Sequence, residues 1–103
     1  MRQEHKFKNM AKIKLDVKIP ISVLKEGENF IVYSPVLDLS TSAKTYKQAL
    51  ARFNEAVEIF FEEIIKRGTL EEALKELGWR KVRAQWEPPL VISQDLQRIR
   101  VTK

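Results

Sequence analysis

The stretch "TYKQALARFNEAVEIFFEEIIKRG", residues 45–68, changes the period of the sequence from that of a strand to that of a helix. Thr45 and Gln48 match a capping box, and Gly68 matches the left-handed residue that often ends a helix. Apolar side chains between them recur every three or four residues and form a stripe wide enough to cover a sheet. They are Tyr46, Ala49, Leu50, Phe53, Ala56, Val57, Phe60, Phe61 and Ile64. We therefore predict an amphipathic helix of about 22 residues.

The residues before this helix predict three strands. Residues 11–25 alternate apolar and polar side chains, with Ile13, Leu15, Val17 and Ile19 on one face, and Pro20 is expected at a bulge or a sheet edge. "EGEN", residues 26–29, supplies a hairpin turn. "FIVYSP" and "VLDLST", residues 30–35 and 36–41, follow as the second and third strands. Strands joined by such short links should form an antiparallel meander.

The residues after the long helix predict a short helix and a C-terminal strand. Thr69 and Glu72 match a second capping box, Gly78 ends this helix, and Trp79 is placed to fold back on its last turn. "RKVRAQWEPP", residues 80–89, is a basic connector, and "LVISQDLQRIRV", residues 90–101, alternates like one strand or two. The expected fold class is α+β, a three-stranded antiparallel sheet packed on one long helix, in the order β-β-β-α-α-β.

Length and charge indicate how the chain is organised. The 103 residues suit one domain, which we place at residues 11–103, after a basic and flexible extension at residues 1–10. The net charge of +5 is concentrated at the two ends, because residues 1–14 and residues 78–103 each carry +4. Cysteine is absent, and no apolar run approaches the roughly 20 residues that span a bilayer. We expect a cytoplasmic protein with no membrane partner.

The sequence predicts no catalytic, cofactor-binding or metal-binding residue. No glycine lies between Pro35 and Gly68, so the hydroxyl-rich residues 34–50 lack the bare backbone of a phosphate-binding loop. The lone histidine, His5, lies in the predicted extension, and a zinc site needs three or four ligands. Asp16 and Asp38 make a poor two-metal site, so a residual nuclease is the weakest hypothesis. We expect a protein that is not an enzyme.

Some large apolar residues lie outside the predicted core. Ile59 and Ile65 lie about 120° to either side of the stripe centred on Phe53, and Trp79 and Trp86 flank the basic connector. Either the second helix and the C-terminal segment fold over these residues, or a subunit or partner covers them. The candidate partner-binding residues are Ile59, Ile65, Trp79, Trp86, Arg98 and Arg100. In an alternative nucleic-acid interface, Arg80, Lys81 and Arg83 would join these arginines and tryptophans.

Residues 12–79 resemble the HicB-type antitoxin family of toxin–antitoxin systems. The resemblance is carried by "GTLEEAL", residues 68–74, and by Phe30, Tyr33, Pro35, Leu37, Thr45, Ala49, Leu50, Ala56 and Phe60. It implies a degraded, partial RNase H-like fold without the acidic nuclease centre. It also implies a protein that binds and inactivates a small HicA-like ribonuclease toxin, and we expect a homodimer or tetramer.

The chain departs from the family pattern at two places. Ala43 and Lys44 stand where the family commonly has glycine, which implies a different loop geometry before the long helix. About two dozen residues follow Trp79, which is short for the helix-turn-helix domain that many family members use to repress their own operon. The resemblance therefore implies toxin binding more directly than DNA binding.

Overall fold

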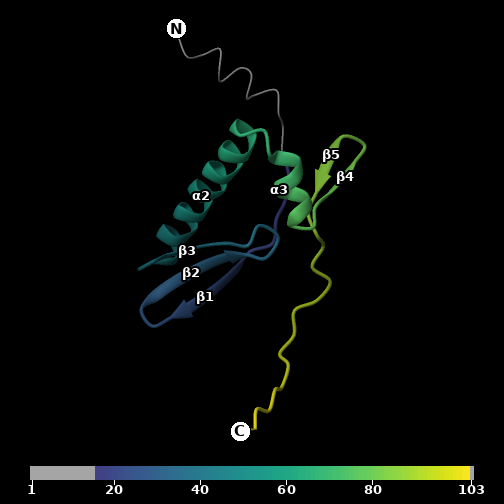
Figure 1. Ribbon diagram of the computed structural model, residues 1–103. Coiled ribbons are helices and arrows are strands. Elements are labelled where there is room, and N and C mark those ends of the chain that lie inside the picture. The colour runs from purple at the N-terminus through teal and green to yellow at the C-terminus, as the bar shows by residue number, and fades with distance from the viewer. Residues whose placement is uncertain (1–15, 103) are drawn as a thin grey trace.

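The long helix lies across one face of a three-stranded antiparallel sheet (Figure 1). The computed structural model describes residues 16–102. The sheet has the order β1-β2-β3, and a separate two-stranded sheet pairs β4 with β5. The elements are β1 (Ser22–Glu26), β2 (Asn29–Ser34), β3 (Leu39–Ala43), α2 (Tyr46–Lys66), α3 (Leu70–Glu76), β4 (Arg80–Val82) and β5 (Gln85–Glu87). This is the predicted α+β fold class.

The register of the sheet separates a covered face from an open one. Val32 of β2 pairs with Val23 of β1 and Thr41 of β3, and these residues share the face toward α2, where Val32 is fully buried. The neighbouring positions Leu24 and Ile31 point to the opposite face because side chains alternate along a strand. Val23 and Leu24 are both exposed, so β1 is poorly covered on either face.

The two ends of α2 are formed as predicted. The Thr45 side chain accepts a hydrogen bond from the backbone amide of Gln48 at 3.1 Å, which satisfies one of the unpaired N–H groups at the start of the helix. Gly68 follows the helix with a φ of +72°, a conformation that glycine adopts without a steric penalty. These local signals fix the length of the helix independently of its packing.

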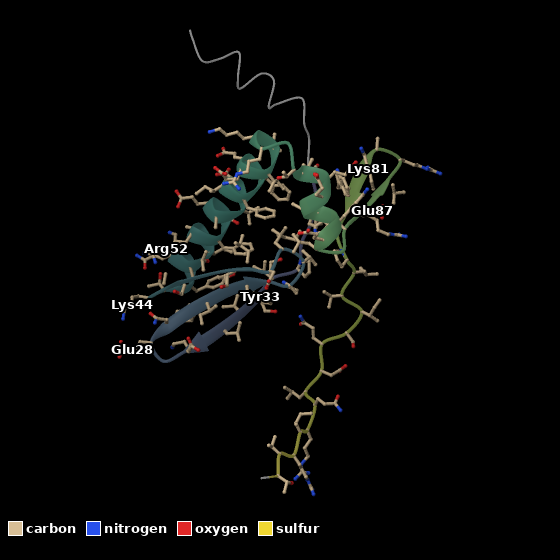
Figure 2. The ribbon with its side chains drawn as sticks, viewed as in Figure 1. Glu28, Tyr33, Lys44, Arg52, Lys81 and Glu87 are labelled. Carbon is tan, nitrogen blue, oxygen red and sulfur yellow. The ribbon has the colours of Figure 1, made fainter. Side chains whose placement is uncertain are left out.

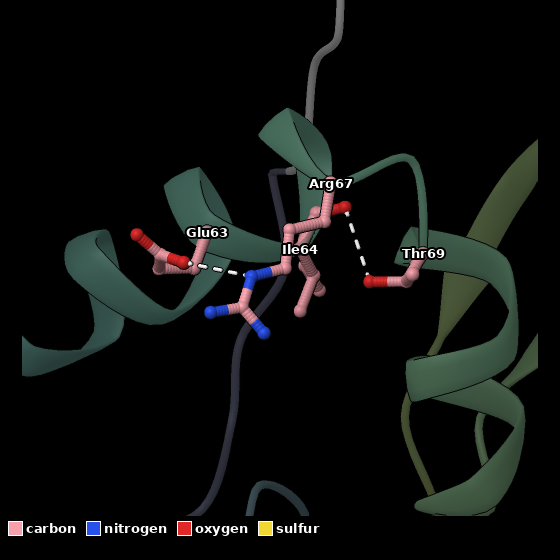
Figure 3. Close-up of polar contacts among 4 residues, drawn as sticks. All are labelled: Glu63, Ile64, Arg67 and Thr69. Carbon is pink, nitrogen blue, oxygen red and sulfur yellow. Dashed lines mark hydrogen bonds and ion pairs between the residues drawn. The ribbon is translucent and has the colours of Figure 1, made fainter.

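The predicted capping box at the start of α3 is wrong. The Thr69 side chain makes no capping bond to α3; its hydroxyl donates to the backbone oxygen of Ile64 at 3.5 Å, across the turn between the helices (Figure 3). Its backbone amide also donates to that oxygen, at 2.8 Å. An ion pair between Arg67 and Glu63, with 3.1 Å between Nε and Oε1, lies on the same turn (Figure 3). The Thr69 hydroxyl and amide therefore help to close α2, while the Thr69 backbone oxygen accepts a hydrogen bond from the Ala73 amide of α3 at 2.9 Å.

Two clusters of buried residues form the core. Val32, Ala43, Ala49 and Phe53 pack between the sheet and the first half of α2. The second cluster joins the end of α2 to α3, to the β4–β5 hairpin and to the turn after β2; it consists of Val36, Leu37, Ile64, Leu74, Trp79 and Trp86. In the part of the chain that the structure describes, no helix has the length and apolar character needed to cross a membrane.

Strand boundaries near the N-terminal end differ from the prediction. Residues 16–21 form no strand, although Val17 and Ile19 pack partly buried against the second cluster, and the predicted strand residues 11–15 lie outside the described part. Val36 was predicted to begin the third strand, but it is buried in a turn and β3 begins at Leu39. Asp38 has a left-handed φ of +51° in this turn, so the chain is not extended there.

The C-terminal strand pair lies earlier in the sequence than predicted. The predicted connector holds the β4–β5 hairpin, whereas residues 88–102 form neither helix nor strand. The hairpin turns at Arg83 and Ala84, which have φ values of +52° and +67°. Beyond the hairpin, residues 90–102 run away from the body of the protein, and we call them the C-terminal arm (Figure 1).

Candidate partner-binding surfaces

The two tryptophans belong to the core, which decides between the two explanations that the sequence left open. Trp79 is 2% exposed and Trp86 is 9% exposed. The indole N–H of Trp79 donates to the backbone oxygen of Val36 at 2.8 Å, and its ring lies edge-on to Phe61. The second helix and the hairpin have therefore folded over both rings, which was the alternative explanation at the sequence level. Neither ring offers a contact surface to a partner that docks on the folded body.

Ile59 lies on the solvent side of α2 and is 54% exposed. Glutamates at helical spacings of three and four residues surround it, and we call Glu55, Ile59, Glu62 and Glu63 the acidic helix face. Residues 55–63 hold four glutamates and no lysine or arginine. Of these glutamates, Glu63 pairs with Arg67. An apolar side chain thus stands among carboxylates on an otherwise charged surface.

Ile65 lies at a second surface, a groove beside α2. The groove has a volume of about 430 Å³, and we call it the α2 groove. Val57, Phe61 and Ile65 follow one another at four-residue spacing along one side, and Val17 and Ile19 of the segment before β1 form the other. Glu58 and Glu62 also line it and carry the negative charge of its rim. The groove exists because α2 lies over the sheet while residues 17–19 run beside the helix.

Arg98 and Arg100 are exposed residues of the C-terminal arm. The side chains of the arm extend into solvent away from the body (Figure 2). Five apolar side chains of the arm are between 71% and 104% exposed: Leu90, Ile92, Leu96, Ile99 and Val101. The arm leaves the body at Pro88 and Pro89, beside a hollow of about 570 Å³ that Lys18 and Pro20 also line. The arm is therefore an apolar and basic segment without internal packing.

The three cations of the alternative nucleic-acid interface lie on or beside the β4–β5 hairpin. Arg80 and Arg83 are exposed. Lys81 is held close to the body, 4.0 Å from the Glu71 carboxylate and 5.8 Å from the centre of the Trp86 ring (Figure 2). Because both tryptophans are buried, no indole face beside these cations is available to stack on a base. The hairpin keeps the charge of the predicted interface and loses its stacking component.

The aspartates of the nuclease hypothesis do not meet. Asp16 is exposed in the segment before β1, and Asp38, in the turn before β3, accepts a hydrogen bond from the Tyr33 hydroxyl at 3.4 Å. Within residues 16–102, no three carboxylate or histidine side chains come together in a group that could hold a metal ion.

The sequence prediction identified Ile59 and Ile65 but missed what surrounds them. It assigned Val17 and Ile19 to a strand face and did not include Glu58 and Glu62 among the candidate residues. The four-residue row of Val57, Phe61 and Ile65 was the signal that could have indicated a groove, because it extends the apolar stripe beyond what one sheet covers. Comparison of the chain with protein-family models, with curated proteins and with solved structures gives no match.

Proposed function

We propose that this chain is a non-catalytic protein-binding module, the antitoxin of a type II toxin–antitoxin system, which binds and occludes a small HicA-like ribonuclease. Its sheet and long helix would be a partial RNase H-like fold, and both proteins would meet in the cytoplasm. The observation that carries the proposal is the acidic helix face with Ile59 exposed at its centre. The resemblance in sequence to HicB-type antitoxins gives the class of partner.

The chemistry of the toxin explains why an acidic surface would inhibit it. A protein that binds RNA must present lysines and arginines to the phosphates. Glu55, Glu62 and Glu63 present carboxylates to the same cations and would compete directly with RNA. Ile59 would supply the apolar anchor that a stable interface needs at its centre, inside a polar rim. Inhibition then requires only an interface of about 1,200–2,000 Å², with no bond made or broken.

The test is binding and inhibition of the small basic protein encoded beside this chain. The two proteins are co-expressed and purified, and cleavage of a labelled RNA is measured with and without the antitoxin. Ile59→Asp combined with Glu55→Lys should raise the Kd by about 30-fold or more, because it removes the anchor and reverses a charge beside it. Glu76→Lys on α3 is the control, since it makes the same charge reversal as Glu55→Lys at an exposed site away from this face.

Two results would overturn the proposal. One is that the neighbouring protein neither binds the chain nor cleaves RNA. The other is that binding is equally strong for the Ile59 variant and for the Glu76 control, which would remove the acidic helix face from the interface.

A second candidate function is nucleic-acid binding through the hairpin and the arm. It is favoured by the exposed positions of Arg80, Arg83, Arg98 and Arg100 in a segment that carries a net charge of +4. Filter binding of single-stranded RNA at increasing salt measures it, because affinity from phosphate contacts falls steeply with salt. Absence of binding at low salt would eliminate this function.

A further inference from the structure

The C-terminal arm has the composition of a segment that packs against something. A flexible, solvated tail is normally poor in large apolar residues, because it has no surface on which to bury them. This arm instead exposes Leu90, Ile92, Leu96, Ile99 and Val101 almost completely. Side chains of this size exposed together on a protein mark a surface that a partner covers.

The α2 groove complements the end of the arm in both polarity and charge. The floor of the groove is apolar, and Glu58 and Glu62 stand on its rim. Residues 96–101, "LQRIRV", contain two arginines and no acidic residue. If they lie as a strand, Ile99 and Val101 point to one side and Arg98 and Arg100 to the other. With the apolar side on the floor, the long arginine stems reach the carboxylates of the rim.

The arm does not lead into the groove of its own chain. Val17 and Ile19 line the groove, whereas Lys18 and Pro20 line the hollow where the arm leaves the body. The groove and the hollow are lined by alternate residues of this segment and share none of them, so they lie on different sides of residues 17–20. Pro88 and Pro89 hold the root extended, and the arm runs away from the body (Figure 1).

We propose that the α2 groove binds the C-terminal arm of a second copy of this chain, so that two copies exchange arms in a homodimer. Each copy supplies one arm and receives one, which is the closed, two-fold arrangement of an isologous interface. Ile59 lies about 120° around the helix from Ile65, so Ile59 remains accessible in the dimer with Glu55 and Glu63. Glu62 belongs both to the acidic helix face and to the rim of the groove. The exchange goes beyond toxin binding and does not depend on it.

The first experiment reverses the charges on each side of the interface. The oligomeric state of the full chain is measured by light scattering after size exclusion, and the wild type is expected to be a dimer. Glu58→Arg with Glu62→Arg, and separately Arg98→Glu with Arg100→Glu, should each raise the dissociation constant by about tenfold or more. Mixing the two variants should restore a heterodimer, because the reversed charges match again. Glu72→Arg with Glu76→Arg is the control that changes the same charge on α3.

A second experiment distinguishes exchange from docking of the arm on its own body. The chain has no cysteine, so single cysteines introduced as Ile65→Cys and Ile99→Cys report only on this contact. Under oxidation, a mixture of the two single variants should form more disulfide-linked dimer than either variant alone, and the double variant Ile65→Cys/Ile99→Cys should link between chains. A disulfide within one chain of the double variant would overturn the proposal.

A wild-type monomer at about 100 µM, far above the Kd of a stable dimer, would also overturn the exchange. So would a dimer whose dissociation constant is the same for the groove variant, the arm variant and the α3 control. Ile59→Asp should leave the dimer intact, which separates the failure of toxin binding from the failure of exchange.

Discussion

Trp79 is expected to stabilise the fold through a hydrogen bond that its neighbour Trp86 does not make. The substitution Trp79→Phe removes the indole N–H and leaves the backbone oxygen of Val36 buried without its 2.8 Å donor. A buried polar group that loses its partner costs about 1–3 kcal/mol. The smaller ring also leaves a space against Phe61, which adds about 1–2 kcal/mol. We therefore expect the free energy of unfolding to fall by about 2–5 kcal/mol.

Trp86→Phe is the matched control for this substitution. Trp86 is also buried, and within the described residues its indole makes no hydrogen bond. It should lose only the packing contribution, about 1–2 kcal/mol. The difference between the two variants isolates the hydrogen bond of Trp79 at about 1–3 kcal/mol.

Urea unfolding followed by far-ultraviolet circular dichroism measures both variants. Each variant keeps one tryptophan. All measurements use the same protein concentration, because the apparent free energy of unfolding of a dimer depends on concentration. With a slope of about 2 kcal/mol per molar urea, Trp79→Phe should lower the midpoint by about 1–2.5 M. Equal losses for Trp79→Phe and Trp86→Phe, within about 0.5 kcal/mol, would refute the argument that the hydrogen bond to Val36 contributes separately.

Three further predictions concern single positions. Ser34→Ala should raise the midpoint of thermal unfolding, because the fully buried Ser34 hydroxyl has no hydrogen-bond partner among residues 16–102, and a lower midpoint would contradict this. Thr45→Ala should cost about 0.5–2 kcal/mol in urea unfolding, whereas Thr45→Ser should restore most of the loss, because serine can accept the same bond from Gln48. Ala84→Gly should raise the urea midpoint by relieving the positive φ of the hairpin turn, and an unchanged or lower midpoint would show that the turn is not strained.

The candidate surfaces show which surface residues composition and periodicity can predict. The sequence placed Ile59 and Ile65 outside the main apolar stripe, and the structure finds Ile59 exposed and Ile65 at a groove. It left open whether the chain itself or a partner covers Trp79 and Trp86, and the structure shows that the chain covers them. The two isoleucines lie on a helix, where the period fixes the direction of every side chain. The tryptophans lie outside the long helix, in segments too short to show a hydrophobic period, so the direction of their side chains depends on contacts with distant residues.

The β4–β5 hairpin escaped prediction for a different reason. Its turn uses Arg83 and Ala84 in left-handed conformations, positions that glycine or asparagine usually occupy. Without those residues the turn carries no sequence signal, and the flanking strands, of three residues each, are too short to show alternation. Packing of Trp86 in the second core cluster holds the hairpin in place.

The sequence by itself determined the elements whose signals are local. The apolar period and the cap at Thr45 define α2, and glycine at positions 27 and 68 ends elements where a positive φ is needed. Only the tertiary structure decided what depends on residues far apart in the chain. Trp79 bonds Val36, 43 positions away, and residues 17–19 meet α2 to form a groove. Such contacts form because the complete fold brings distant residues together and buries them. A short window of sequence does not contain that information.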